Sequence, residues 1–167
     1  TDINSILQIG STMYFGTMDG LLYLDLYNKN WDLIDETDGL NDSAVWDILE
    51  YDGSVFLATA NGLIEISIVN HSIIPDKYKK FADLISSNIY EIKADSQYLY
   101  IASDAGLLQM HWDTREINTL SKKHFARIHI KQNLIWGTDG TLWEINDIDD
   151  EKHIISEVYD FDICGTY

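Results

Sequence analysis

Residues 13–24, MYFGTMDGLLYL, form the first of four copies of one segment. The other copies are VFLATANGLIEI at 55–66, LYIASDAGLLQM at 99–110 and LIWGTDGTLWEI at 134–145. They align without a gap, and their small residues follow one another at offsets of 42, 44 and 35 residues. Self-similarity at a period of about 40 residues is typical of repeat architectures. The repeated segment is therefore the strongest indication of the fold class.

Each copy is expected to form a β-hairpin. A small residue stands where neighbouring sheets approach closely, and a hydroxyl residue follows that can hydrogen-bond to the backbone of the coming turn. A glycine that can take positive φ then reverses the chain, and a leucine begins the exit strand. The structural repeat positions are Gly16, Thr17, Gly20, Leu21, Ala58, Thr59, Gly62, Leu63, Ala102, Ser103, Gly106, Leu107, Gly137, Thr138 and Leu142. The fourth copy has Thr141 in the glycine column and Gly140 before it, which predicts a different turn type.

Further strands are expected on both sides of each hairpin. An inner strand precedes it, most clearly at 45–48 and 89–92 and more weakly at 3–6 and 125–128. Weaker outer strands follow, such as those at 31–34 and 153–156. Helical periodicity is scarce, and 78–84 is the one stretch that suggests a helical turn. The pattern predicts an all-β fold, a β-propeller of four four-stranded antiparallel blades.

The expected blades span about 1–36, 37–80, 81–122 and 123–158. Residues 159–167, which contain Cys164, parallel the residues that lead into the first hairpin. We therefore expect the first strand of a further blade there, and the segment to be a fragment of a larger ring. Because about four blades can already close a propeller, a closed four-blade ring is the alternative.

The stretches DGLNDSAVWDIL at 38–49 and VFLATANGL at 55–63 resemble the two-component-regulator propeller repeat. That family's pattern runs D-G-L, then V-x-x-I, an acidic turn, and L-W-I-G-T-x-x-G-L; Asp52 and Gly53 fall at the turn. The resemblance covers essentially the whole chain. It implies a bladed sensor or ligand-binding domain, periplasmic or extracellular and joined to signalling or secretion modules. Its motifs are structural, so it assigns no functional residue.

The charge balance restricts the possible partners. There are 28 acidic and 11 basic residues, a net charge of −17. Such a surface repels phosphate backbones and anionic lipids, which argues against nucleic acid and against membrane contact by this segment. The acidity serves solubility, or it attracts a cationic ligand, a metal ion or a basic protein. The segment shows no signal peptide and no apolar stretch near the roughly 20 residues of a membrane span.

No set of residues predicts a catalytic, cofactor-binding or metal-binding site. The oxygen-rich loops at 35–42 and 146–151 lack the spacing of a calcium-binding loop. The histidines are scattered, and His124 and His129 would point to opposite faces of a regular strand. We therefore predict no catalytic residue, no cofactor-binding residue and no metal ligand.

The sequence favours a non-catalytic binding scaffold, either a ligand-sensing or a protein-interaction domain of a larger protein. Its expected partners are a cationic ligand or protein and the remaining propeller blades of the parent chain. The alternative is a propeller-type hydrolase or lyase acting on polysaccharide, with carboxylates from several blades meeting at the channel.

Overall fold

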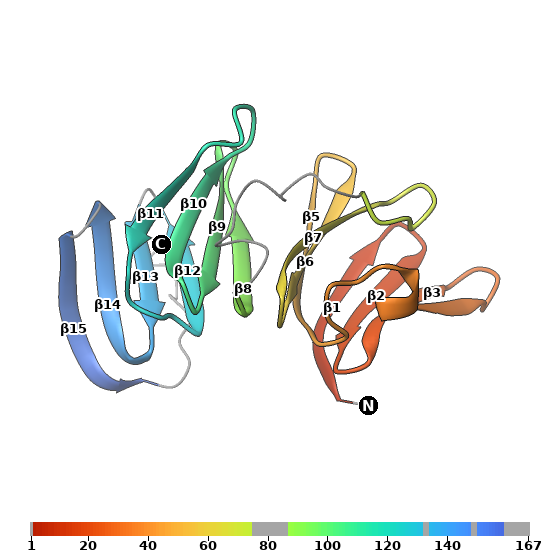
Figure 1. Cartoon of the computed structure of the whole chain (residues 1–167), viewed down its shortest axis with the longest axis horizontal. Coiled ribbons are helices and arrows are strands. Elements are labelled where there is room, and N and C mark those ends of the chain that lie inside the picture. Colours follow the sequence, from red (N-terminus) through yellow and green to blue (C-terminus); the bar gives the residue numbers. More distant parts are fainter. Residues whose placement is uncertain (1, 75–86, 132–133, 148–149, 159–167) are drawn as a thin grey trace, which may run out of the picture. The chain divides into compact units, whose positions relative to one another are not determined.

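The computed structural model describes residues 2–74, 87–131, 134–147 and 150–158, and these residues form an all-β protein. Their strands make four antiparallel sheets, and the helical structure among them is one 3-10 turn, η1 (Glu36–Asp38) (Figure 1). The chain divides into two compact units, Thr1–Ile89 and Tyr90–Tyr167, which we describe separately.

The first unit contains two sheets that follow each other in sequence. Sheet A has the order β1 (Ile3–Ile9), β2 (Thr12–Thr17), β3 (Gly20–Asp25) and β4 (Trp31–Ile34). Sheet B has the order β5 (Val45–Tyr51), β6 (Ser54–Thr59) and β7 (Gly62–Ser67). Each strand pairs with its sequence neighbour, so each sheet is a simple meander.

Sheet B departs from the expected four strands. Ile73 makes one isolated antiparallel bridge to Ile66, where sheet A has the whole strand β4. The backbone N–H of Ile74 still donates to Glu65 O at 2.8 Å. Pro75 follows directly, and because proline has no N–H it cannot continue a ladder. Within the described residues, the second sheet therefore has three strands and one isolated bridge, where four strands were predicted.

The second unit contains the other two hairpin copies. Sheet C consists of β8 (Ile89–Ala94), β9 (Tyr98–Ser103), β10 (Gly106–His111) and β11 (Ile117–Ser121). Sheet D consists of β12 (Arg127–Lys131), β13 (Leu134–Thr138), β14 (Gly140–Asp147) and β15 (Asp150–Val158). The outer strands expected at 31–34 and 153–156 are thus present as β4 and within β15. The helical turn expected at 78–84 and the partial blade at 159–167, with Cys164, lie outside the described residues.

Each unit has a core between its two sheets. In the first, Tyr14, Leu21 and Ile34 of sheet A meet buried aliphatic residues of sheet B. Those residues of sheet B are Val45, Ile48, Val55, Leu57, Ile64 and Ile66. In the second unit, Tyr100, Leu107 and Leu120 of sheet C meet Ile128, Ile135 and Ile145 of sheet D, with Phe125 among them. No helix in the described part of the chain is long and apolar enough to cross a membrane.

Candidate functional site

The first three hairpins close their turns with their own hydroxyl group. Each hydroxyl donates to the carbonyl oxygen of the glycine three residues later: Thr17 to Gly20 at 2.9 Å, Thr59 to Gly62 at 2.7 Å, and Ser103 to Gly106 at 2.9 Å. The three glycines have φ of 134°, 105° and 121°, values that residues with a side chain rarely adopt. These positions therefore fix the shape of the hairpin and are too deeply buried to meet a ligand.

The small residue of the first hairpin lies against the next sheet. A Cβ added to Gly16 would stand 3.0 Å from both Cγ1 and the carbonyl oxygen of Val45 in β5. Ala58 and Ala102, the next small residues, are fully buried. A larger side chain at Gly16 would push sheets A and B apart.

The fourth hairpin has a different register. Thr138 pairs with Leu142, whereas Thr17 pairs with Gly20, so its turn is one residue longer, as its altered glycine position predicted. Trp143 consequently lies opposite Gly137, the place that Leu21 takes opposite Gly16. Leu142 therefore does not share the position of the other three leucines, contrary to the gapless alignment.

Gly137 also differs in what it faces. A Cβ there would stand 2.6 Å from Cδ1 of the Phe125 ring, in the core shared with the preceding sheet. The equivalent Gly16 faces Val45 of the following sheet. Gly137 pairs across β12 and β13 with Ile128, whose side chain lies in that core, so the two residues share this face of sheet D.

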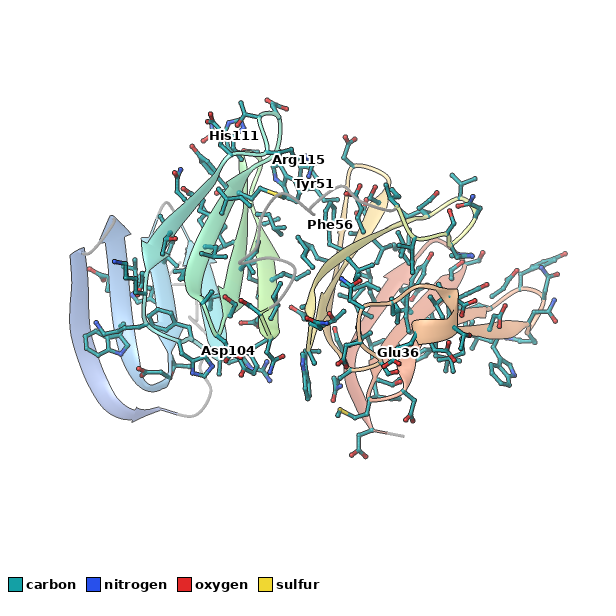
Figure 2. All side chains as sticks on the ribbon, in the orientation of Figure 1. Glu36, Tyr51, Phe56, Asp104, His111 and Arg115 are labelled. Atoms are coloured by element: carbon teal, nitrogen blue, oxygen red, sulfur yellow. The ribbon has the colours of Figure 1, made fainter. Side chains whose placement is uncertain are left out.

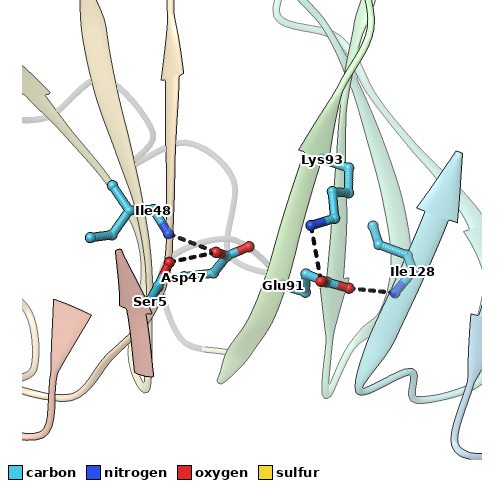
Figure 3. Close-up of polar contacts among 6 residues, drawn as sticks. All are labelled: Ser5, Asp47, Ile48, Glu91, Lys93 and Ile128. Atoms are coloured by element: carbon cyan, nitrogen blue, oxygen red, sulfur yellow. Dashed lines mark hydrogen bonds and ion pairs between the residues drawn. The ribbon is translucent and has the colours of Figure 1, made fainter. Parts of the chain in front are cut away.

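Acidic residues of the inner strands bind the neighbouring sheet. In the first unit, Ser5 Oγ donates to Asp47 Oδ1 at 3.0 Å and so joins β1 to β5 (Figure 3). In the second, the backbone N–H of Ile128 donates to Glu91 Oε2 at 2.5 Å, and Lys93 Nζ lies 3.0 Å from Glu91 Oε1. These charge-assisted contacts give Asp47 and Glu91 a structural role between sheets.

The acidic loop at 35–42 is held by its own hydrogen bonds. Asp35 Oδ1 accepts from the N–H and the hydroxyl of Thr37, each at 2.7 Å, and the Thr37 hydroxyl bond is the main reason that the pKa of Asp35 is lowered. Glu36, labelled in Figure 2, accepts from the Ser43 hydroxyl at 3.0 Å. No group of three or more His, Cys, Asp or Glu residues that could hold a metal occurs among the described residues. Part of the second loop, 146–151, lies outside them.

The histidines occupy separate places. His111 lies at the outer turn of sheet C with Arg115 (Figure 2), and His124 contacts the ring of Tyr90 edge-on at 4.8 Å. His129 lies 6.3 Å from Trp136, centroid to centroid. His71 lines a cavity of the first unit.

A second repeated element, at the outer turns, positions His71. In each turn the first residue donates its N–H to the carbonyl oxygen five residues later, and the fifth residue donates back to the first. The turns span residues 25–30, 67–72 and 111–116, and their fifth residues Lys29, His71 and Arg115 have φ of 60°, 55° and 57°. In the middle copy this left-handed position carries the imidazole of His71.

The His71 ring lies on an aromatic side chain of the preceding sheet. It stacks on Tyr23 at 4.0 Å between centroids with 27° between planes, and Tyr14 meets it edge-on at 5.8 Å. Burial lowers the pKa of His71. Burial raises the pKa of Tyr23, and the charge of Asp32 raises it further. The stacked pair is therefore uncharged at neutral pH.

Around this pair lies an open cavity of about 310 Å³ between β3–β4 and the turn after β7. Its lining consists of Thr12, Tyr23, Asp25, Asn30, Trp31, Asp32 and His71. Tyr23 OH donates to Asp32 Oδ2 at 3.4 Å, and the Trp31 side chain is 68% exposed. We call this cavity the Tyr23–His71 pocket.

The Tyr23–His71 pocket combines two carboxylates with aromatic faces, and no Lys or Arg is among its lining residues. A cation gains from the negative face of an aromatic ring and from a nearby carboxylate. The pocket is thus suited chemically to a small cationic group. The sequence alone does not reveal this pocket, because its two halves come from different repeats. The similar outer turns at 25–30 and 67–72 could have indicated that these two segments occupy equivalent places in neighbouring sheets.

Comparison with known proteins shows the fold. No protein-family model matches the chain, and no curated protein matches it either. Among solved structures, the extracellular domain of the hybrid two-component system BT4673 from B. thetaiotaomicron is similar at a TM-score of 0.78 and 21% identity. The match covers 96% of this chain and 23% of that one. The corresponding domain of BT3049 from the same organism has a TM-score of 0.66 and 19% identity over 93% of this chain and 22% of that one.

The chain thus spans less than a quarter of the length of these extracellular domains. It also resembles the computationally designed Ika4 protein, at a TM-score of 0.63 and 13% identity, over 86% of this chain and 90% of that protein. Sheets of this kind therefore occur both within extracellular domains of two-component systems and in a designed protein.

Proposed function

We propose that this chain is a non-catalytic binding segment of a sensor-type β-propeller, periplasmic or extracellular, whose four sheets are blades of a larger ring. The Tyr23–His71 pocket would contact a small cationic ligand. The observation that carries this proposal is the pocket lining of Asp25, Asp32 and aromatic rings without a lysine or arginine. The likeness to extracellular domains of two-component systems supports the sensing role.

The polysaccharide hydrolase alternative receives no support from the inner strands. Among the described residues there, Asp47 and Glu91 accept hydrogen bonds that join neighbouring strands. Each of these two carboxylates thus has a structural use.

A titration with choline tests the proposed ligand class. Followed by NMR, choline should shift the resonances of Tyr23, Trp31 and His71, whereas its uncharged isostere 3,3-dimethyl-1-butanol should not. Asp32→Asn should weaken choline binding about fivefold, the effect of about 1 kcal/mol expected for an exposed cation site. Binding should also weaken from low to physiological ionic strength.

Asp113→Asn is the matched control, because it removes one exposed charge in the second unit and leaves the pocket intact. Equal binding of choline and the alcohol, or choline binding that ignores salt, would refute the cationic-ligand proposal.

A further inference from the structure

Tyr14 carries a buried hydroxyl group that has no hydrogen-bond partner among the described residues. The side chain is 0% exposed, and burial raises its pKa, so the hydroxyl stays protonated at neutral pH and is a hydrogen-bond donor. A buried donor without an acceptor destabilises the folded state, and such groups are rare in folded proteins. Departures of this kind commonly mark functional sites.

The equivalent positions of the repeat show that packing does not require this hydroxyl. Sheet B has Phe56 in place of Tyr14, at the offset of 42 residues, and Phe56 is 1% exposed. Sheet C has Tyr100, whose hydroxyl donates to Asp95 Oδ2 at 2.9 Å and accepts from Gln109 Nε2 at 3.4 Å. A phenyl ring is thus sufficient at this position in one sheet, and a hydroxyl is hydrogen-bonded there in another.

Sheet A differs at both positions that bind the hydroxyl in sheet C. Ile9 takes the place of Asp95, and Tyr23 takes the place of Gln109, at the offset of 86 residues. Ile9 is apolar and packs against the core of the first unit, and the hydroxyl of Tyr23 donates to another side chain. A partner for the Tyr14 hydroxyl must therefore come from outside these two positions.

Tyr14 lies directly behind the Tyr23–His71 pocket. Tyr14 and Tyr23 are paired across β2 and β3, so their side chains stand on one face of sheet A. Their ring centroids lie 6.4 Å apart with 39° between planes, and the imidazole of His71 meets the Tyr14 ring edge-on at 5.8 Å. Both neighbours of Tyr14 line the pocket, so a ligand in the pocket is separated from Tyr14 by these two rings.

An acceptor reaches the Tyr14 hydroxyl when the imidazole of His71 moves aside. His71 belongs to the outer turn 67–72, in which Val69 is 91% exposed. A turn with few buried side chains opens at low free energy. The same movement leaves the face of Tyr23 to the cationic group of the ligand.

We propose that Tyr14 is a specificity-determining residue of the Tyr23–His71 pocket and that its hydroxyl donates to an uncharged oxygen of the ligand. The ligand class is then an ammonium compound that also carries a carbonyl oxygen. An uncharged acceptor fits better than a carboxylate, because Asp25 and Asp32 repel a further negative charge. This inference rests on the proposed function, which supplies the cationic part of the ligand.

Two compounds with the same cationic group test the proposal. Acetylcholine carries an ester carbonyl, and pentyltrimethylammonium has a chain of the same length without one. In NMR titrations of the whole chain, acetylcholine should bind more tightly, and Tyr14→Phe should weaken its binding about fivefold, the effect of one hydrogen bond. The same variant should change the binding of pentyltrimethylammonium by less than about twofold.

The stability of the ligand-free protein is an independent readout. Tyr14→Phe should raise the urea midpoint, because it removes a buried hydroxyl that has no partner among the described residues. Tyr100→Phe is the matched control, the same substitution at the equivalent position of sheet C. It should lower the midpoint, because Asp95 and Gln109 lose a hydrogen-bond partner, and it should leave the binding of both compounds unchanged.

The outcomes separate this inference from the proposed function. If Tyr14→Phe changes the binding of the two compounds to the same extent, this inference is overturned and the cationic pocket stands. A urea midpoint that Tyr14→Phe lowers as much as Tyr100→Phe does also overturns it, because the hydroxyl then has a partner in the free protein. If neither compound binds, the proposed function fails, and this inference fails with it.

Discussion

Sheets A and B carry the same repeat in the same register, yet they differ in the burial of one face. Val45 is fully buried in sheet B, whereas its counterpart Ile3 in sheet A is 55% exposed. Leu57 is likewise fully buried, whereas Phe15 lines an open groove. The hydrophobic pattern of a repeat therefore indicates which faces the repeats can bury against one another. The same pattern does not predict which of these faces are actually buried in a given segment of the chain.

The largest effect should separate the two faces directly. Leu57→Ala should lower the free energy of unfolding by about 2–5 kcal/mol, because it leaves a cavity in a closed core. Phe15→Ala should cost less than half as much, because part of the ring already contacts solvent. Urea unfolding of the two variants measures both values. Similar losses in the two variants would contradict the exposure of this face of sheet A.

A smaller effect should be equal in the two sheets. Thr17→Val and Thr59→Val each remove a hydroxyl that donates to a buried glycine carbonyl, at 2.9 and 2.7 Å. Each should reduce the free energy of unfolding by about 1–2 kcal/mol, since the acceptor loses its partner. Because these turns lie in equivalent, buried positions, a loss confined to one of the two sheets would contradict their equivalence.

The smallest effect should come from the residue that links the two sheets, His71. Burial lowers its pKa in the folded protein, so the unfolded chain binds the proton first as the pH falls. Stability from this group is therefore complete above the unfolded pKa of about 6.5 and is lost as the pH falls from there through the folded pKa. His71→Gln should remove this part of the pH dependence of the urea midpoint.

NMR titration of the imidazoles gives the direct measurement. His71 should titrate below the usual value and should lose its contact shifts with choline as it becomes charged. His111→Gln, at an outer turn of the second unit, is the control and should leave the His71 titration unchanged. A His71 pKa at or above 6.5 would contradict its burial against Tyr23.

The sequence predicted the four hairpins well, because turn chemistry and the strand period are local signals that recur four times. It failed where one position departs from the repeat. Among the described residues, sheet B has one isolated bridge at Ile73 in place of a fourth strand, and a single glycine displaced to 140 changes the pairing of Trp143. The expected change of turn was right, but the different neighbour of Gly137 could not be read without coordinates.

The candidate pocket was harder to predict than the sheets. Tyr23 and His71 lie far apart in sequence, and their stacking depends on the left-handed conformation of one turn residue. The three copies of that turn have Lys29, His71 and Arg115 at the same position. Because these side chains differ chemically, the residue types did not indicate a shared binding position. The inner-strand contacts of Asp47 and Glu91 were missed for a similar reason, since they bind partners in other sheets.

The hydroxyl-closed turn has a consequence for how such a chain can lengthen. Thr17, Thr59 and Ser103 each donate a hydrogen bond to a carbonyl oxygen inside their own hairpin. When the gene segment for such a hairpin is duplicated, the new hairpin can therefore form its turn without contacts from another repeat. After a duplication, only the contacts between adjoining sheets have to form anew. The hydrogen bond from Ser5 to Asp47 is one such contact. Divergence between copies should therefore accumulate on the inner strands and outer turns, while the hairpin tips remain alike.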